Sequence, residues 1–298
     1  MQIFSGSTNP SLARKIARNL DVPMGKVELS VFPNNELRVW VKEKKVDKDV
    51  AVVQSFAGDP NKAIIEFCLL IDALRRCGAH HITAVIPWMG YCIQDKIFRP
   101  GEALSAKVVA NIIQSVNPNR IITVDLHNES IQGFFSVPIT HLSANPLFID
   151  LIKQKKAVDC IVSPDVGALK ETTRIAYELN LPMVVVNKKR DLKTGEVSII
   201  SISGDCKDKR ALIMDDFIST GGTLIQTINF LKKNKAKKTI VAATHHLFVE
   251  GTQQKLAKSS LNELYITDTV DMPQLDTKVS LETNIISVSG IIAEALAE

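Results

Sequence analysis

Short apolar runs alternate with segments of helical periodicity along the first half of the chain. The runs carry few charges, which is typical of strands buried on both faces of a parallel sheet. The segments between them repeat apolar residues every three or four positions, as amphipathic helices do. The predicted order is strand 49–54, helix 61–76, strand 82–86, helix 106–116 with Ser105 as its expected cap, and strand 120–125. This order predicts a parallel sheet covered by helices on both sides.

The same pattern restarts in the second half of the chain. It predicts strands over 160–163, 182–186, 211–214 and 239–244, helices over 171–179 and from Leu224 onward, and a strand-like segment 284–287 before a helix over 289–296. Residues 142–157, which include Pro146, have the character of a junction. We therefore expect an α/β protein of two domains of similar size, residues 1–143 and 144–298.

Residues 26–42 follow a different pattern, because apolar and polar residues alternate there one by one. A period of two is that of a strand with one buried face. Pro33, Asn34 and Asn35 interrupt the alternation with residues that favour turns. This segment is predicted to be an antiparallel hairpin outside the main sheet.

The composition limits the possible classes of protein. Of 298 residues, 45% are hydrophobic and 23% charged, and no apolar run reaches the length of about 20 residues that spans a bilayer. The five cysteines have no CxxC spacing and we expect no signal peptide, so reduced thiols and a cytoplasmic location are predicted. The net charge of +4 suits small phosphorylated ligands and indicates neither a nucleic-acid surface nor a membrane partner. The lysines within 232–238 are read as a solvated helix end rather than a binding patch.

The stretch 209–223 carries the most specific chemistry. Asp215 and Asp216 follow a predicted strand, and residues 219–223 read Ser-Thr-Gly-Gly-Thr before a helical pattern. Glycines let backbone N–H groups approach a phosphate, a helix N-terminus favours its charge, and the hydroxyls add hydrogen bonds. The carboxylates would accept hydrogen bonds from sugar hydroxyls. A sugar-phosphate site is therefore predicted; the alternative is an ordinary crossover with a glycine turn.

Polar residues also follow three other predicted strands, where open α/β sheets bind ligands. His127 comes just after Asp125 and is either a metal or phosphate contact or a structural histidine. Asp165, in Ser-Pro-Asp-Val-Gly, either binds Mg²⁺ or belongs to a simple turn. Residues 187–191, Asn-Lys-Lys-Arg-Asp, form either a basic loop that stabilises a transferring phosphoryl group or a solvated loop.

Two further observations concern a nucleotide. Gln94 and Asp95 lie in a polar loop that follows Pro-Trp-Met-Gly-Tyr, whose aromatic residues could stack on a base; a plain surface loop is the alternative. The chain has no GxxxxGK[ST] sequence, so a bound nucleotide would be held without a Walker-type loop.

With these motifs in order, the chain resembles the ribose-phosphate pyrophosphokinases over essentially its whole length. Residues 215–223 resemble the family's ribose-5-phosphate loop, and residues 32–36 its ATP-binding hairpin. Residues 123–127 with 131–135 are very close to the family pattern around a metal-binding histidine. Residues 244–246, Thr-His-His, lie where the family has a Thr-His-Gly turn.

The resemblance implies two tandem phosphoribosyltransferase-like domains with the active site between them. It implies attack of the C1 hydroxyl of ribose 5-phosphate on the β-phosphorus of Mg-ATP, giving phosphoribosyl pyrophosphate and AMP. The implied roles are as follows: Lys188 and Arg190 catalytic; Asp215, Asp216, Ser219, Thr220, Gly221, Gly222 and Thr223 for ribose 5-phosphate; Phe32, Asn34, Asn35, Glu36, Gln94 and Asp95 for ATP; and His127 and Asp165 for Mg²⁺. Gln94 and Asp95 would act from a neighbouring subunit, in a homo-oligomer that is a dimer, tetramer or hexamer.

The chain departs from the family pattern at three places. Ile93 stands where the family usually has an arginine before Gln94, which removes a probable cationic contact to ATP. Ser219 stands where an acid is frequent, although serine is familiar in one branch. Residues 95–107 are short, as in the compact branch that tends to lack ADP allostery. Two alternatives stay open: a catalytically silent homologue that regulates an active partner, and a phosphoribosyltransferase.

Overall fold

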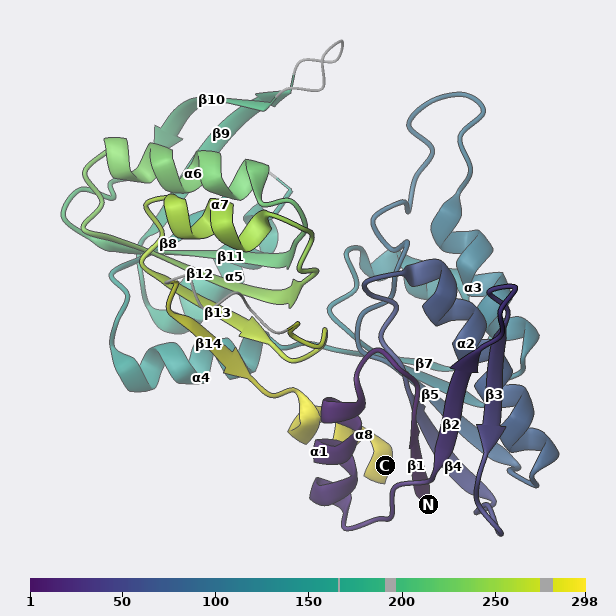
Figure 1. Cartoon of the computed structure of the whole chain (residues 1–298). Helices are drawn as coiled ribbons and strands as arrows, with labels where there is room; N and C mark the ends of the chain where they lie inside the picture. Colours follow the sequence, from purple (N-terminus) through teal and green to yellow (C-terminus); the bar gives the residue numbers. More distant parts are fainter. Residues whose placement is uncertain (166, 191–196, 274–280) are drawn as a thin grey trace. The chain divides into compact units, whose positions relative to one another are not determined.

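The computed structural model describes residues 1–165, 167–190, 197–273 and 281–298. The chain forms two compact units, shown in Figure 1. Unit 1 comprises Met1–Ser143, Asp268–Asp271 and Ser287–Glu298, and unit 2 comprises Ala144–Thr267 and Met272–Ile286. The last helix thus packs in unit 1, whereas the expected division of the sequence had placed it in the second half. None of the described helices is long and apolar enough to cross a membrane.

Unit 1 contains a parallel sheet with the strand order β1-β4-β5-β6-β7. These strands are Gln2–Ser5 (β1), Asp49–Val53 (β4), His81–Ile86 (β5), Arg120–Val124 (β6) and Ile139–Leu142 (β7). Most central residues of β1, β4, β5 and β6 are buried, which explains the continuous apolar runs in the sequence, whereas β7 is half-buried. The predicted strands of the first half are confirmed, and β1 and β7 are additions that the sequence pattern did not show.

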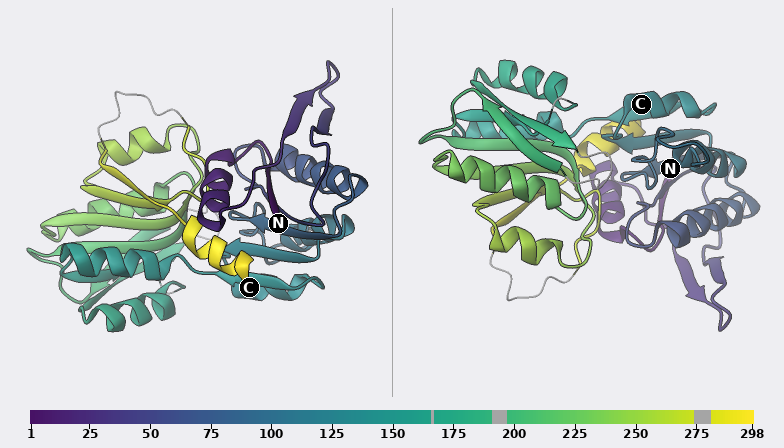
Figure 2. Two further views of the ribbon diagram at one scale, coloured as in Figure 1. Left: turned by 90° about the horizontal axis from the view of Figure 1, so that it is seen from below. Right: turned by 90° about the horizontal axis from the view of Figure 1, so that it is seen from above.

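Helices cover both faces of this sheet. Helices α1 (Pro10–Leu20) and α8 (Ser289–Ala297) pack together on one face, and α2 (Pro60–Arg76) and α3 (Ser105–Ser115) lie on the other, as Figures 1 and 2 show. Asp59 caps α2 by accepting from the N–H groups of Asn61 and Lys62. The expected cap of α3 was wrong: Leu104 is its N-cap, and the Ser105 hydroxyl donates instead to Gln94 Oε1 at 2.8 Å.

Two pieces of the late chain are fixed into unit 1 by Asp268. Its carboxylate accepts from Lys15 Nζ at 2.7 Å, from the Ser287 hydroxyl at 2.6 Å and from the Val288 N–H at 2.9 Å. Asn9 Nδ2 donates to the Asp268 carbonyl at 2.8 Å. These contacts between distant residues explain why the sequence pattern alone did not assign residues 268–271 and 287–298 to unit 1.

The predicted hairpin is confirmed. Strands β2 (Val27–Val31) and β3 (Leu37–Val41) pair antiparallel as a separate two-stranded sheet. The turn between them is closed by the Asn35 N–H, which donates to the Phe32 carbonyl at 2.8 Å. Asn35 has φ +69°, a conformation that asparagine tolerates better than most residues. One face of β3 packs on α2.

Unit 2 contains a sheet with the strand order β10-β9-β8-β11-β12-β13-β14, parallel except for β10. The strands are Cys160–Ser163 (β8), Met183–Arg190 (β9), Val197–Ser203 (β10), Arg210–Ile218 (β11), Lys238–His246 (β12), Glu263–Thr267 (β13) and Thr283–Ile286 (β14). In Figure 1, α4 (Asn145–Lys155) and α5 (Leu169–Leu179) cover one face, and α6 (Gly222–Lys233) and α7 (Thr252–Lys258) the other.

Unit 1 also contains a short 3-10 helix, Glu129–Phe134 (η1), after β6.

The predicted strands and helices of the second half are confirmed in place, but two strands are longer than expected. β9 runs on past Val186 because β10 pairs with it antiparallel as far as Arg190. β11 runs on past Met214 because β12 pairs with it as far as Ile218. Lys232 and Lys233 occupy the last turn of α6, as the solvated helix end predicted.

Candidate functional site in two halves

The loop 219–223 joins the carboxyl end of β11 to the N-terminus of α6. Gly221 is the N-cap of the helix and has φ +73°, a conformation that costs L-residues with a Cβ roughly 1–2 kcal/mol. The Thr252 hydroxyl of α7 donates to the Ser219 carbonyl at 3.0 Å and fixes the start of the loop. The sequence therefore folds here into a tight turn that places the N-terminus of α6 at the carboxyl end of β11.

The backbone of this loop can receive an anion. Among the described residues, no protein acceptor takes a hydrogen bond from the N–H groups of residues 220–223. Thr220, Gly222 and Thr223 are exposed, so a ligand can reach these donors. Unpaired N–H groups at a helix N-terminus, together with the helix dipole, form a site for a phosphate.

Asp215 and Asp216 lie inside β11 rather than after it, which corrects their expected place beyond the strand. The Asp216 N–H donates to Asp215 Oδ1 at 3.0 Å, and the Phe217 N–H donates to Asp216 Oδ1 at 2.9 Å. Burial raises the pKa of Asp215 well above its usual range, and the charge of Asp216 adds to the increase. Hydrogen-bond donors or a cation near this pair would relieve the repulsion between the two carboxylates.

Asp165 influences Asp215, which also belongs to unit 2. Its carboxylate contributes to the raised pKa of Asp215, which places both carboxylates in one electrostatic environment. Asp165 Oδ1 also accepts from the Ala168 N–H at 3.0 Å, and its carbonyl accepts from the Ser163 hydroxyl at 2.8 Å. Both sequence interpretations of Asp165 thus have support, since the side chain stabilises a turn and lies with the acids of the candidate site.

Lys188 and Arg190 lie on β9, not on a loop that begins after Val186. They pair with Ile199 and Val197 of β10, respectively. The rest of the predicted basic loop, from Asp191 onward, lies outside the described residues. Strand β9 lies between β10 and β8 in the sheet, and β8 leads into Asp165.

In unit 1, His127 follows β6 on a short loop and its side chain is exposed. His141 Nε2 accepts from the Leu126 N–H at 2.9 Å, and the Asp125 N–H donates to the Leu142 carbonyl at 2.9 Å. Asp125 takes φ +33°, an unusual value for a residue with a side chain. Strand β7 therefore fixes the position from which His127 extends.

The structure brings the predicted loop 94–95 next to His127. Asn128 Nδ2 donates to Asp95 Oδ2 at 2.7 Å, and the Asp95 side chain is only 5% exposed. Gln94 Oε1 accepts from the Ser105 hydroxyl at 2.8 Å, so the N-terminus of α3 anchors this loop. Ile93, in the turn before Gln94, is 38% exposed.

The hairpin residues Phe32, Asn34, Asn35 and Glu36 are all exposed. The Phe32 N–H donates to the Glu36 carbonyl at 2.8 Å, and the Glu36 N–H donates to Asn34 Oδ1 at 3.3 Å. An exposed aromatic ring on a well-bonded turn is suited to stack on a base. This half of the candidate site is therefore an exposed hairpin tip.

The two residues predicted to hold Mg²⁺, His127 and Asp165, lie in different units. Within the described residues, no group of three or more His, Cys, Asp or Glu is arranged to hold a metal ion. Mg²⁺ in phosphoryl-transfer sites is held by one or two carboxylates together with substrate phosphates and water. Asp165 supplies such a carboxylate, and His127 supplies a nitrogen donor, a weaker type of ligand for this ion.

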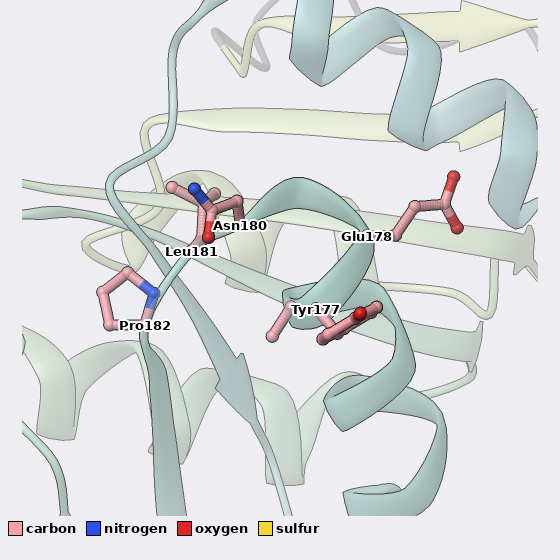
Figure 3. Close-up of a pocket in the computed structure, with 6 residues that line it drawn as sticks. Tyr177, Glu178, Asn180, Leu181 and Pro182 are labelled. Atoms are coloured by element: carbon pink, nitrogen blue, oxygen red, sulfur yellow. The ribbon is translucent and has the colours of Figure 1, made fainter.

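A depression of about 660 Å³ in unit 2 lies elsewhere (Figure 3). Tyr177 and Glu178 of α5 and Asn180, Leu181 and Pro182 after it line this depression. It lies where α5 ends and β9 is about to begin, at the amino end of the strand. Ligand sites of open α/β sheets occupy the carboxyl ends, so this depression is not part of the candidate site.

Comparisons with known proteins identify the family of the chain. Residues 1–116 match the N-terminal domain of ribose phosphate pyrophosphokinase, and residues 140–271 match a phosphoribosyl transferase domain. The chain is 36% identical over its full length to the ribose-phosphate pyrophosphokinase of Burkholderia pseudomallei and covers 93% of that protein. It belongs to the ribose-phosphate pyrophosphokinase family.

Two further members support the assignment. The ribose-phosphate pyrophosphokinase of Campylobacter jejuni is 36% identical over 99% of the chain, which covers 94% of that relative. The crystal structure of phosphoribosylpyrophosphate synthetase from Mycobacterium smegmatis superimposes with a TM-score of 0.90 at 32% identity, covering 99% of this chain and 97% of that one. The predicted fold, two phosphoribosyltransferase-like domains with parallel sheets flanked by helices, is confirmed.

Three residues near the candidate site were not singled out from the sequence of this pyrophosphokinase family member. Asn128 contacts Asp95, His141 fixes the loop that carries His127, and Thr252 fixes the phosphate loop. In the sequence, the only indication of a role for Asn128 was its position one residue after His127. His141 and Thr252 act across the fold, and nothing in their local sequence shows this.

Proposed function

We propose that this member of the family is a ribose-phosphate diphosphokinase, acting on Mg-ATP and ribose 5-phosphate. The C1 hydroxyl oxygen of the sugar forms a bond to the β-phosphorus of ATP and gives up its proton. The bond from the β-phosphorus to the oxygen shared with the α-phosphate breaks, and AMP leaves. The products are phosphoribosyl pyrophosphate and AMP.

The loop 219–223 would bind the 5-phosphate of the sugar. The single observation that carries this proposal is the set of N–H groups in residues 220–223, at the start of α6, which donate to no described acceptor. Asp215 and Asp216 precede this loop on the same strand and would accept hydrogen bonds from the ribose hydroxyls. Such contacts fix the C1 hydroxyl and lower the entropic part of the barrier.

The ATP side of the reaction would use the hairpin tip and the loops of unit 1. Phe32 would stack on the base, with Asn34, Asn35 and Glu36 as polar contacts, and Gln94 and Asp95 would supply a second set. Lys188 and Arg190 would stabilise the charge that develops on the transferring group. His127 in unit 1 and Asp165 in unit 2 would each serve as a ligand of Mg²⁺, whose positive charge would neutralise the phosphate chain of the nucleotide.

A phosphoribosyltransferase is the less favoured reading. The match of residues 1–116 to the pyrophosphokinase N-terminal domain adds a second unit that a phosphoribosyltransferase does not need. Ile93, which replaces an expected cation, is the observation that keeps a silent regulatory homologue as the other alternative. The homo-oligomer, the compact-branch regulation and the cytoplasmic location remain predictions.

The test is AMP formation from Mg-ATP and ribose 5-phosphate, measured for the wild type and for Lys188→Ala. We expect AMP from the wild type and little from the variant, because Lys188 would stabilise the transferring group. A wild type that makes no more AMP than Lys188→Ala would reject the diphosphokinase. Release of pyrophosphate from phosphoribosyl pyrophosphate and a nucleobase would instead identify a phosphoribosyltransferase.

A further inference from the structure

The outer face of strand β3 carries an exposed aromatic residue between two cationic residues. Along this strand, Leu37, Val39 and Val41 are the more buried residues, and β3 packs on α2. Alternation of side chains puts Arg38, Trp40 and, just beyond the strand, Lys42 on the opposite face. All three are exposed, and the Trp40 side chain retains 46% of its accessible surface.

The two cations are held against the Trp40 ring. Lys42 Nζ lies 3.5 Å and Arg38 Cζ 5.3 Å from the ring centroid, both within the range of cation–π attraction. Lys42 Nζ also pairs with Glu28 Oε2 at 2.7 Å, so its charge is neutralised locally. Among the described residues, the Arg38 side chain forms no ion pair or hydrogen bond, although its charge, after that of Lys42, helps to lower the pKa of Glu28. An exposed guanidinium, which carries five N–H donors, thus lies beside the Trp40 ring.

The same face continues to the tip of the hairpin. Ser30 pairs with Arg38 and Glu28 with Trp40, so these four residues share one face of the two-stranded sheet. Phe32 and Glu36 lie two residues beyond Ser30 and before Arg38, respectively, and the 2.8 Å bond from the Phe32 N–H to the Glu36 carbonyl extends the pairing to them. Positions two apart on a strand are separated by about 7 Å, which an extended arginine side chain can span. Arg38 is therefore the first cation along the strand from the tip that would hold the base.

We propose that Arg38, which lies beside the Trp40 ring, is an additional ATP-binding residue that contacts the phosphate chain of the nucleotide held at the hairpin tip. This proposal rests on the proposed function, because it takes Phe32 and Glu36 as contacts of the base end. Arg38 would also compensate for a positive charge that is missing at position 93. Ile93 removes a cation that the family usually places before Gln94, and Arg38 supplies a positive charge on the other predicted nucleotide-binding segment.

The ligand of this face is an anion rather than a second base. Lys42 lies 3.5 Å from the ring centroid and so covers one face of the indole. A guanidinium is suited to bind two phosphate oxygens at once, whereas an ammonium acts as a point charge. Arg38 should consequently be more sensitive to substitution than Lys42, although Lys42 lies closer to the ring.

Steady-state AMP formation tests this assignment with three variants: Arg38→Ala, Arg38→Lys and Lys44→Ala. Lys44 is an exposed cation just past the hairpin strand and is the charge-matched control. Loss of one charge-assisted contact should raise the KM for ATP about 10-fold in Arg38→Ala, with kcat and the KM for ribose 5-phosphate nearly unchanged. Arg38→Lys should give an intermediate value, and Lys44→Ala should match the wild type.

Tryptophan fluorescence provides a measurement that does not require turnover. The chain has two tryptophans, and Trp88 is 4% exposed whereas Trp40 is open to solvent. Adding Mg-ATP without ribose 5-phosphate should change the emission of the wild type and of Lys44→Ala, but not that of Trp40→Phe. In Arg38→Ala, the change should require about 10-fold more ATP.

The possible outcomes distinguish the two proposals, the diphosphokinase activity and the Arg38 contact. A wild type that makes no AMP but shows the Trp40 signal, with about 10-fold more ATP needed in Arg38→Ala, rejects the diphosphokinase and supports the Arg38 contact. Normal AMP formation with an unchanged KM for ATP in Arg38→Ala rejects the contact and leaves the proposed function intact. Equal losses in Arg38→Ala and Lys44→Ala would also reject it, because they would indicate a general effect of positive charge.

Discussion

Asn128 Nδ2 lies 2.7 Å from Asp95 Oδ2 and joins the loop after β6 to the loop before α3. Asn128 Oδ1 accepts from the Ser130 N–H at 3.0 Å, so this one amide connects η1 with Asp95. The two loops contain His127 and Gln94, which we assign to the metal and to the nucleotide. The geometry of the ATP half of the site thus depends on a residue that need not touch ATP.

Asn128→Ala should raise the KM for ATP several-fold, because a buried hydrogen bond to a carboxylate contributes about 1.5–3 kcal/mol and its loss frees both loops. The KM for ribose 5-phosphate should change little. The measurement is AMP formation at varied ATP, with Asn111→Ala on the exposed face of α3 as the control. If the KM for ATP is the same in both variants, the hydrogen bond from Asn128 to Asp95 does not position the ATP-binding loops.

Gly221→Ala should weaken the binding of ribose 5-phosphate. Its φ of +73° would cost alanine roughly 1–2 kcal/mol, and the added methyl would meet Thr252 Cγ2 at 3.4 Å. The loop would shift and its N–H groups would lose their common direction. Gly290→Ala is the control, since nothing lies within 4 Å of that position and alanine suits the helix α8. In Gly221→Ala, the KM for ribose 5-phosphate should rise and the melting temperature should fall. In Gly290→Ala, neither of these changes should occur.

Asp216→Ala should weaken ribose 5-phosphate more than ATP, because its partner would be a sugar hydroxyl. The loss of one charged acceptor corresponds to about 10-fold or more in the KM for the sugar. Removing this charge should also lower the pKa of Asp215, whose increase Asp216 strengthens. Kinetics at varied concentrations of each substrate would check this. Equal losses for both substrates would contradict the assignment.

His246 should make folding stability depend on pH. Burial lowers its pKa to about 4, and its Nδ1 accepts from the Phe248 N–H at 2.9 Å, which requires the neutral ring. The unfolded chain has the ordinary value near 6.5 and so binds more protons between pH 6.5 and 4. The free energy of unfolding should therefore fall as the pH decreases through this window, by about 3 kcal/mol in all.

Denaturant unfolding at pH 7 and at pH 4.5 checks this dependence. His246→Asn should be less stable at pH 7 but should lose less stability on acidification than the wild type. His80→Asn, at an exposed position, should behave like the wild type at both values. A wild-type slope that His246→Asn leaves unchanged would assign the acid sensitivity to other groups.

The sequence pattern predicted the parts of the fold that depend on local periodicity. Buried parallel strands are continuous apolar runs and helices repeat at 3.6 residues, so 49–53, 82–86 and 160–163 were recognisable without the structure. Strand ends were less predictable. Asp215 and Asp216 are polar, and they belong to β11 because Asp215 pairs with Ala243 and Phe217 with His245 of β12. In the same way, Lys188 and Arg190 form strand because β10 returns beside them.

The sequence by itself also determined the residue types of the individual motifs, because the glycines, hydroxyls and acids of residues 215–223 predict a phosphate-binding loop by their types and order. The tertiary structure decided how each motif is held. His141 and Thr252 fix loops that lie 15 and 33 residues away, and Asp268 returns to unit 1 from the far end of the chain. Such contacts form between residues distant in sequence, and local periodicity carries no information about them. Arg38 and Trp40 belong to both levels: alternation placed them on one face, and only the fold showed that the guanidinium lies 5.3 Å from the ring centroid.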